Sequence, residues 1–273
     1  MFAVDSQVHI WGPETPERPW PADGKNLRHR FLTPEALIGE MSAAGVQRAV
    51  LVPPAFEGDR NDVVIAAAQK YPARFGVMGR LTLDLPESRN AIRAWRECPG
   101  MLGIRQSFFT PQHRAVLASG AADWFWPAAE AAGIPVYVFC PGLVHVMGEV
   151  ARSHPALRLV ISHFGLAPQA DLRDLHAAVD QLLEVARYPN MAVTASALPC
   201  HVDEPYPFPS LREPVRKVIG AFGASRVFWG SDLTRLPCTY QEMVMFGRQL
   251  EGLSSVELEQ FMGAGLMRWL RWE

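Results

Sequence analysis

The chain has 273 residues, of which 49% are hydrophobic and 20% are charged, so it is long enough for one large core, and we expect a single domain over residues 1–273. A net charge of −2 at pH 7, without a polybasic segment, argues against nucleic acid or a membrane surface as a partner and favours a small molecule. No leader pattern occupies the first residues, and no stretch approaches the ~18 apolar residues of a membrane-spanning helix, which predicts a cytoplasmic protein.

The first predicted strand is Asp5–Trp11, in which polar and apolar residues alternate with a period of two. Gln7 and His9 therefore project from the same face, where an imidazole and a second polar group can hold a metal or a substrate oxygen. A purely structural role for one histidine on a short strand stays open. The proline-rich segment 12–21 is predicted to be a loop. Trp11 and Trp20 either line the floor of a pocket or only fix this loop by their burial.

Helices and strands then alternate along the chain. Thr33–Gly45 has the N-cap, first-turn proline and terminal glycine of a complete helix. Further helices are predicted at 63–71, 87–96, 123–132 and 171–187, from Glu213 to about 222, and from a Ser254–Glu257 capping box onward. Strands are predicted at 49–52, 75–81, 101–106, 134–140, 159–163, 191–196 and 227–232. This alternation predicts an α/β fold with a parallel sheet.

Three of the later strands end in an ionisable residue, namely Arg105, His163 and Asp232. In a (β/α)8 TIM barrel of roughly 250 residues, the carboxyl ends of all strands meet at one face, and catalytic groups come from several of them. We therefore predict such a barrel, with His9 and these three residues converging. The guanidinium of Arg105 is suited to bind a carboxylate or a lactone carbonyl, and the alternative is that it forms a structural ion pair. For Asp232 the alternative to a catalytic role is that it caps a helix.

At these segments the chain resembles the amidohydrolase superfamily, in its lactonase-like branch of hydrolases that open pyrone-dicarboxylate and sugar lactones. The resemblance covers essentially the whole chain and rests on segments that occur in the family's order: Asp5–Trp11, Gly103–Gln106, Ser162–Gly165, Gly230–Asp232 and Phe261–Arg268. It implies a TIM barrel, hydrolytic chemistry and substrate contact by Arg105.

The chain departs from the metal-dependent members of that family in two places. Gln7 stands where the first histidine of the family's His-x-His motif would be. Phe139 and Cys140 stand where a metal-binding histidine of the fifth strand would be sought, and His145 in the next segment is expected on a helix.

Ester hydrolysis needs one group that takes a proton from water and another that polarises the carbonyl. Asp232 is the candidate base, provided that its pocket raises its pKa. His9 and His163 would polarise the carbonyl or stabilise the tetrahedral intermediate, directly or through a metal. Gln7, Arg105 and Trp11 are the candidate substrate-binding residues.

A catalytic zinc typically has three protein ligands, which His9, His163 and Asp232 could supply. Because the amide of Gln7 binds divalent metals weakly, we expect hydrolysis without metal or with one weakly held divalent ion, zinc being the first candidate.

Three functions remain open from the sequence. The first is a hydrolase for a lactone or cyclic ester of sugar-acid or aromatic catabolism, with lactone isomerisation as a close variant. The second is a zinc-dependent decarboxylase of the same superfamily, and the third is a non-catalytic barrel that binds a small acid. The apolar helix faces also leave a homo-oligomer open.

Overall fold

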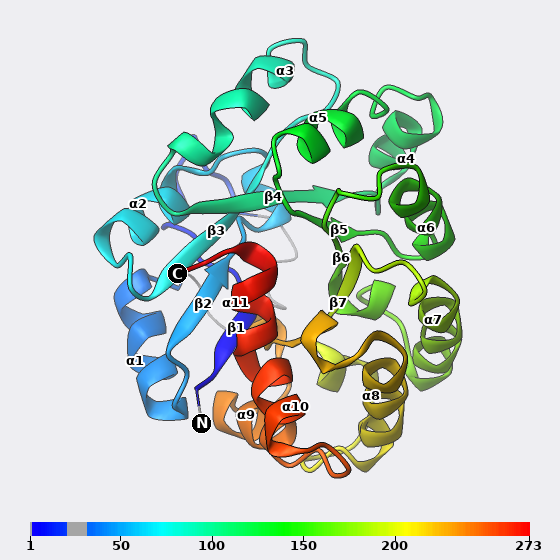
Figure 1. Cartoon of the computed structure of the whole chain (residues 1–273). Coiled ribbons are helices and arrows are strands. Elements are labelled where there is room, and N and C mark those ends of the chain that lie inside the picture. Colours follow the sequence, from blue (N-terminus) through cyan, green and yellow to red (C-terminus); the bar gives the residue numbers. More distant parts are fainter. Residues whose placement is uncertain (1, 21–31) are drawn as a thin grey trace.

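The computed structural model describes residues 2–20 and 32–273, and in it eight strands form a nearly closed barrel ringed by helices (Figure 1). Each strand pairs in parallel with the next along the chain. The strands are β1 Val4–Val8, β2 Arg48–Leu51, β3 Phe75–Arg80, β4 Met101–Ser107, β5 Val136–Phe139, β6 Leu159–Ile161, β7 Met191–Ala195 and β8 Val227–Trp229. The predicted (β/α)8 TIM barrel is confirmed.

Within the described residues, the helices surround the barrel. They are α1 Pro34–Ala44, α2 Asp62–Lys70, α3 Ser88–Ala91 with its 3-10 continuation Ile92–Glu97, α4 Pro111–Ala118, α5 Phe125–Ala131, α6 Val144–Ser153, α7 Leu172–Val185, α8 Pro209–Phe222, α9 Tyr240–Arg248, α10 Ser255–Glu259 and α11 Gly265–Leu270. None of them is long and apolar enough to cross a membrane.

Local signals fixed several helix ends as predicted. The hydroxyl of Thr33 accepts a hydrogen bond from the N–H of Ala36 at the start of α1, and Gly45 ends that helix in the left-handed conformation. The capping box of Ser254 and Glu257 opens α10. Helix caps are readable from sequence because their hydrogen bonds join residues only two or three positions apart.

Other elements differ from the prediction. Helix α4 was not predicted, and α8 begins at Pro209 instead of Glu213, with Pro214 inside it. The helix extends back to Pro209 because Leu211, Pro214 and Val215 are all buried on its inner face, and this burial outweighs the hydrogen bond that a proline removes. Residue 21 of the predicted loop 12–21 lies outside the described residues.

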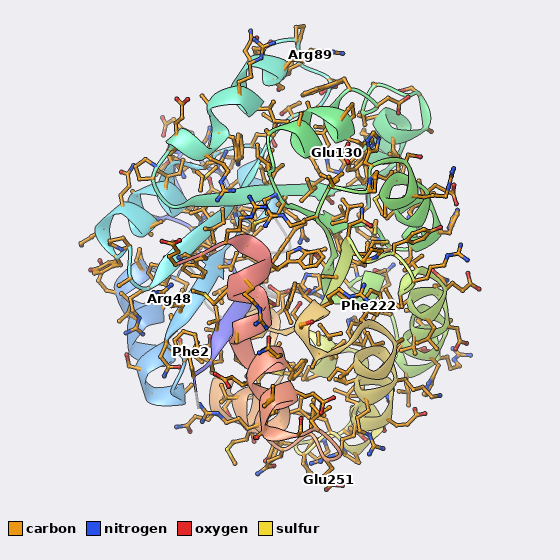
Figure 2. The ribbon with its side chains drawn as sticks, in the orientation of Figure 1. Phe2, Arg48, Arg89, Glu130, Phe222 and Glu251 are labelled. Atoms are coloured by element: carbon orange, nitrogen blue, oxygen red, sulfur yellow. The ribbon has the colours of Figure 1, made fainter. Side chains whose placement is uncertain are left out.

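The amino end of the barrel is closed by the C-terminal segment. Leu266, Leu270 and Trp272 pack with Val4, Val50 and other inward-facing strand residues in one buried cluster, and α11 lies across the middle of the ring of strands (Figure 1). Arg48, labelled in Figure 2, donates from Nη1 to the carbonyl of Glu273 at 2.7 Å. The open end of the barrel is therefore the one at which the strands finish.

The seam between β1 and β8 is closed by side-chain bonds, since no ladder pairing between these two strands is found among the described residues. The buried carboxylate of Asp5 accepts hydrogen bonds from the N–H of Ser231 at 2.9 Å, from the Ser231 hydroxyl and from the Tyr240 hydroxyl at 2.7 Å. Burial raises the pKa of Asp5 to about 6, although these bonds oppose the rise. The N–H of Asp232 also donates to the carbonyl of Gln7 at 3.0 Å.

Candidate active site

The side chains singled out in the sequence meet in one cavity of about 250 Å³ at the carboxyl ends of the strands. Six of its lining residues are Gln7, His9, Trp11, Arg105, His163 and Asp232. Trp20 is not among the lining residues, and its indole donates to the carbonyl of Gly12. Residues more than 220 positions apart are thus brought together because each follows or ends a strand of the same barrel.

Tight turns direct two of these side chains into the cavity. His163 and Asp232 have left-handed backbone conformations, with φ of 52° and 53°. Such a conformation is uncommon for residues other than glycine and is found preferentially at functional sites. Next to Asp232, Gly230 lies so close to β1 that a Cβ there would come within 2.2 Å of the Ser6 hydroxyl oxygen. Only glycine lets these two strands approach so closely.

Gln7 is fully buried and connects the polar side chains of the site. Arg105 Nη1 donates to Gln7 Oε1 at 3.0 Å and to the Ser162 hydroxyl at 2.5 Å. Because a guanidinium can only donate, the oxygen of the Gln7 amide must face Arg105 and its NH₂ group must face the histidines. Gln7 Nε2 lies 2.9 Å from His163 Nε2 and 3.4 Å from His9 Nε2. Both Nε2 atoms therefore accept.

This arrangement assigns the protons of the two imidazoles. With Nε2 as acceptor, Nδ1 carries the hydrogen, and His9 Nδ1 donates to the carbonyl of Val52 at 2.7 Å. His163 Nδ1 donates to the hydroxyl of Ser196 at 2.8 Å. Burial lowers the pKa of His9, and it lowers that of His163 to about 3 even though Asp232 opposes the shift. Both rings are neutral at pH 7.

Asp232 lies beside both histidines with only 1% of its surface exposed. Its Oδ1 is 3.3 Å from His9 Nε2, and its Oδ2 is 3.9 Å from His163 Nε2 and 3.6 Å from Arg235 Nη1. Burial alone would raise the pKa of Asp232, but the histidines, Arg235 and Arg105 lower it below its ordinary value. The expectation of a raised pKa is therefore wrong, and Asp232 is a carboxylate at neutral pH.

The donor set does not fit a tightly bound divalent metal. His9, His163 and Asp232 are neighbours, but the NH₂ group of Gln7 donates to the Nε2 lone pairs that a metal would need. Among the described residues no group of three or more His, Cys, Asp or Glu side chains could hold a metal ion. Phe139 occupies the position of the expected fifth-strand ligand and packs edge-on against His163, with ring centroids 5.8 Å apart. His145 is exposed on α6.

The structure adds residues that the sequence did not single out. The Ser162 hydroxyl accepts a hydrogen bond from Arg105, and the Ser196 hydroxyl accepts one from His163 Nδ1. Arg80 also lines the cavity. Arg80 ends β3 just as Arg105 lies near the end of β4, so its position at a strand end was the signal that could have found it. His201, from the long loop after β7, is buried and bonds the carbonyl of Ala170 at 2.9 Å instead of lining this cavity.

Comparisons with known proteins give a consistent picture. A model of the family described as "Amidohydrolase" matches residues 4–264. The L-fucono-1,5-lactonase of Burkholderia ambifaria is 29% identical over 249 residues, which cover 85% of this chain and 80% of that protein.

Two solved structures show the same fold. A zinc-bound crystal structure of an amidohydrolase from Burkholderia multivorans has a TM-score of 0.85 at 20% identity and covers 100% of both chains. The structure of a probable 2-pyrone-4,6-dicarboxylic acid hydrolase from Acinetobacter baumannii, with citric acid bound, has a TM-score of 0.76 at 17% identity and covers 99% of this chain and 100% of that one.

Proposed function

The chain belongs to the amidohydrolase family, and from this premise we propose that it opens a small lactone or cyclic ester by adding water at the Asp232 carboxylate. The lactonase from Burkholderia ambifaria that it resembles supports this class of substrate. The observation that carries the proposal is the pair of half-buried His9 Nε2 and buried Asp232 Oδ1, two hydrogen-bond acceptors only 3.3 Å apart that both line the cavity.

Two acceptors at this distance need hydrogens between them. Asp232 Oδ1 accepts no hydrogen bond from the described residues, and His9 Nε2 receives only the 3.4 Å contact from Gln7. A water that donates one hydrogen to each atom satisfies both and turns its oxygen lone pairs away from them, toward the cavity. This is the orientation that a nucleophilic water requires.

The reaction then balances with groups of this site. The water oxygen forms a bond to the lactone carbonyl carbon while one of its protons passes to Asp232. The positive charge of Arg105 stabilises the resulting oxyanion. When the bond between the acyl carbon and the ring oxygen breaks, Asp232 returns the proton to that oxygen, and the product is an open-chain hydroxy acid. Arg105 replaces the histidines as the polarising group, because their Nε2 atoms are acceptors in this arrangement.

We propose that this reaction proceeds without a tightly held metal, since the hydrogen bonds of Gln7 occupy the imidazole lone pairs. The decarboxylase alternative relied on a full zinc site, which this donor set does not fit. The partner implied is a small lactone and its acid product.

The test is Asp232→Asn, assayed on a panel of γ- and δ-lactones with a pH indicator. We expect kcat to fall by about a hundredfold to ten-thousandfold, the usual contribution of a positioned base, with unchanged circular dichroism. The matched control is Asp203→Asn, an exposed aspartate of the loop after β7 that lies outside this cavity. Full activity of folded Asp232→Asn would refute the mechanism, and binding of lactones by the wild type without turnover would identify a non-catalytic barrel.

A further inference from the structure

Asp5 is a completely buried carboxylate that the proposed mechanism does not use. Its Oδ1 accepts the N–H of Gln7 at 3.1 Å and the N–H of Ser231 at 2.9 Å. Its Oδ2 accepts the Ser231 hydroxyl and, at 2.7 Å, the hydroxyl of Tyr240, whose ring is stacked on Trp229 with centroids 6.4 Å apart. One carboxylate thus binds the backbone on both sides of the seam between β1 and β8.

The bonds of Asp5 fix the backbone that enters the turn at Asp232. The N–H and the hydroxyl of Ser231 both bond Asp5, and its carbonyl accepts the N–H of Ala197 at 3.2 Å. The next residue, Asp232, has a φ of 53°. A residue other than glycine keeps this left-handed conformation only where the surrounding structure imposes it. Here the surrounding structure is the hydrogen-bonded Ser231.

The side chain of Asp232 has few contacts of its own to hold it. Its Oδ1 accepts no hydrogen bond from the described residues. Its Oδ2 lies 3.9 Å from His163 Nε2 and 3.6 Å from Arg235 Nη1, beyond the length of a hydrogen bond. The proposed water lies between Oδ1 and His9 Nε2, and a misplacement of about 1 Å can lower a rate about a hundredfold. The carboxylate therefore depends on the backbone of the turn for its position.

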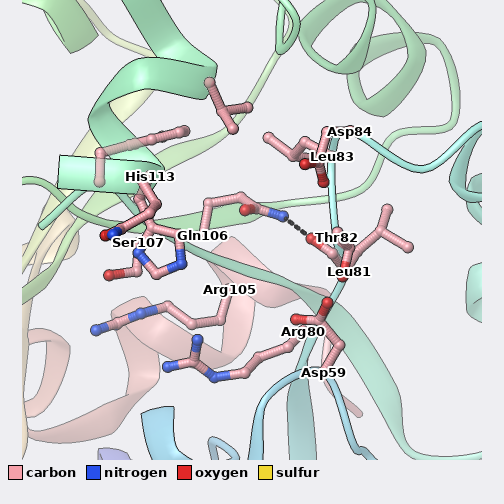
Figure 3. A pocket seen from close by; sticks show the side chains of 13 residues that line it. Asp59, Arg80, Leu81, Thr82, Leu83, Asp84, Arg105, Gln106, Ser107 and His113 are labelled. Carbon is pink, nitrogen blue, oxygen red and sulfur yellow. Dashed lines mark hydrogen bonds between the residues drawn. The ribbon is translucent and has the colours of Figure 1, made fainter. Parts of the chain in front are cut away.

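The neighbouring strands β3 and β4 show what the seam lacks. They pair in register at four positions, one of which is Arg105, so the backbone ladder itself fixes the position of that residue. Figure 3 shows a further link between them, in the cavity of about 270 Å³ beside the catalytic one, where Gln106 Nε2 donates to the carbonyl of Leu81 at 2.8 Å. Between β1 and β8 the structure describes no ladder, and the side-chain bonds of Asp5 take its place.

We infer that Asp5 is the positioning residue of the catalytic carboxylate and acts by holding Ser231, so that Asp232 keeps its left-handed turn. The inference rests on the proposed function, in which Asp232 takes a proton from water. Asp5 is not among the residues that line the catalytic cavity. It acts on the reaction through the backbone of its neighbours and has no contact with the substrate.

The first variant is Asp5→Asn, which keeps an oxygen for the two N–H donors but has an NH₂ group that cannot accept the two hydroxyl hydrogens. Burial raises the pKa of Asp5 to about 6, so lactone opening is assayed at pH 8, where the wild-type residue is a carboxylate. We expect kcat to fall about tenfold to a hundredfold while KM changes less than about twofold. Tyr240→Phe should lower kcat less. The double variant should lose less than the product of the two single losses, because both changes break the same bond.

The matched control is Asn190→Ala, at the amino end of β7 and away from the site. Asn190 is also buried, and its Nδ2 donates to three backbone carbonyls, those of Ala151, His154 and Leu157. This change should also lower the melting temperature, but it should leave kcat unchanged at temperatures where all variants are folded. A fall of kcat in Asp5→Asn no larger than in this control, or a change in KM alone, would overturn the positioning role.

The outcomes separate the inference from the proposed function. A wild type that opens no lactone counts against the proposed function, and crystal structures of the wild type and Asp5→Asn then decide the inference. Displacement of the Asp232 carboxylate by more than about 1 Å from its place beside His9 supports the positioning role, and an unmoved carboxylate overturns it. If Asp5→Asn does not fold, Tyr240→Phe decides in the same way: unchanged kcat with an unmoved carboxylate overturns the inference.

Discussion

Replacing Gln7 with methionine tests the hydrogen-bond network at the centre of the site. Methionine has nearly the same length and no polar group that could replace the amide. The change removes the bond from Arg105 at 3.0 Å and the two contacts to the Nε2 atoms of His163 and His9 at 2.9 and 3.4 Å. Because Gln7 is fully buried, water cannot readily take its place.

The expected loss follows from these three contacts. A bond to a charged group contributes about 1.5–3 kcal/mol and a neutral one about 0.5–1.5 kcal/mol, so Gln7→Met should lower the free energy of unfolding by about 4 kcal/mol. At about 2–4 °C for each kcal/mol in a chain of this size, the melting temperature should fall by roughly 8–16 °C. Urea unfolding followed by circular dichroism gives the free energy by linear extrapolation.

The matched control is Gln106→Met, on β4. Gln106 is also buried, at 7% exposure, but it makes one hydrogen bond, from Nε2 to the carbonyl of Leu81 at 2.8 Å. We expect this variant to lose about 1 kcal/mol. If both variants lose the same amount, the assignment of the Gln7 amide as the connection between Arg105 and the two histidines is refuted.

Two further predictions concern protons and metals. The pKa of His163 is about 3 in the folded chain, against an ordinary value of 6.5. Between these two pH values the unfolded chain binds more protons than the folded one, so the free energy of unfolding falls as the pH falls from 6.5 toward 3. At pH 5 this loss amounts to about 2 kcal/mol. Urea midpoints of His163→Asn should depend less steeply on pH than those of the wild type, and equal slopes would contradict this pKa. Removing divalent metals with EDTA should leave lactone opening unchanged, and activity that disappears and returns with added zinc would show that a metal acts at the site.

The fold was predictable because its signals are local and repeated. Strands that end in a polar residue, a Thr33 cap followed by proline, and a capping box at Ser254 each depend on a few neighbouring residues. The beginning of α8 was missed because burial of Leu211 and Val215 against the barrel decides it, and burial depends on residues distant in the chain.

The meeting of the site residues was predictable for the same reason, since every parallel barrel gathers its strand ends at one face. The protonation state of each of these residues was not predictable from the sequence. The direction of the Asp232 pKa depends on whether His9, His163, Arg235 and Arg105 together outweigh its burial, and only the folded chain gives their distances from the carboxylate. The protons of His9 and His163 depend on which end of the Gln7 amide faces Arg105, a contact across 98 positions of sequence.

The seam of the barrel links folding to catalysis. Gln7 and Asp232 lie on opposite sides of it, joined by the bond from the Asp232 N–H to the Gln7 carbonyl and by the bonds of Asp5 to Ser231. A nascent chain that ends before β8 has five of the six site residues named above but lacks the carboxylate of Asp232. The rate at which activity returns during refolding should therefore report the rate at which the last strand pairs with the first. Enzyme turnover then measures the final step of folding.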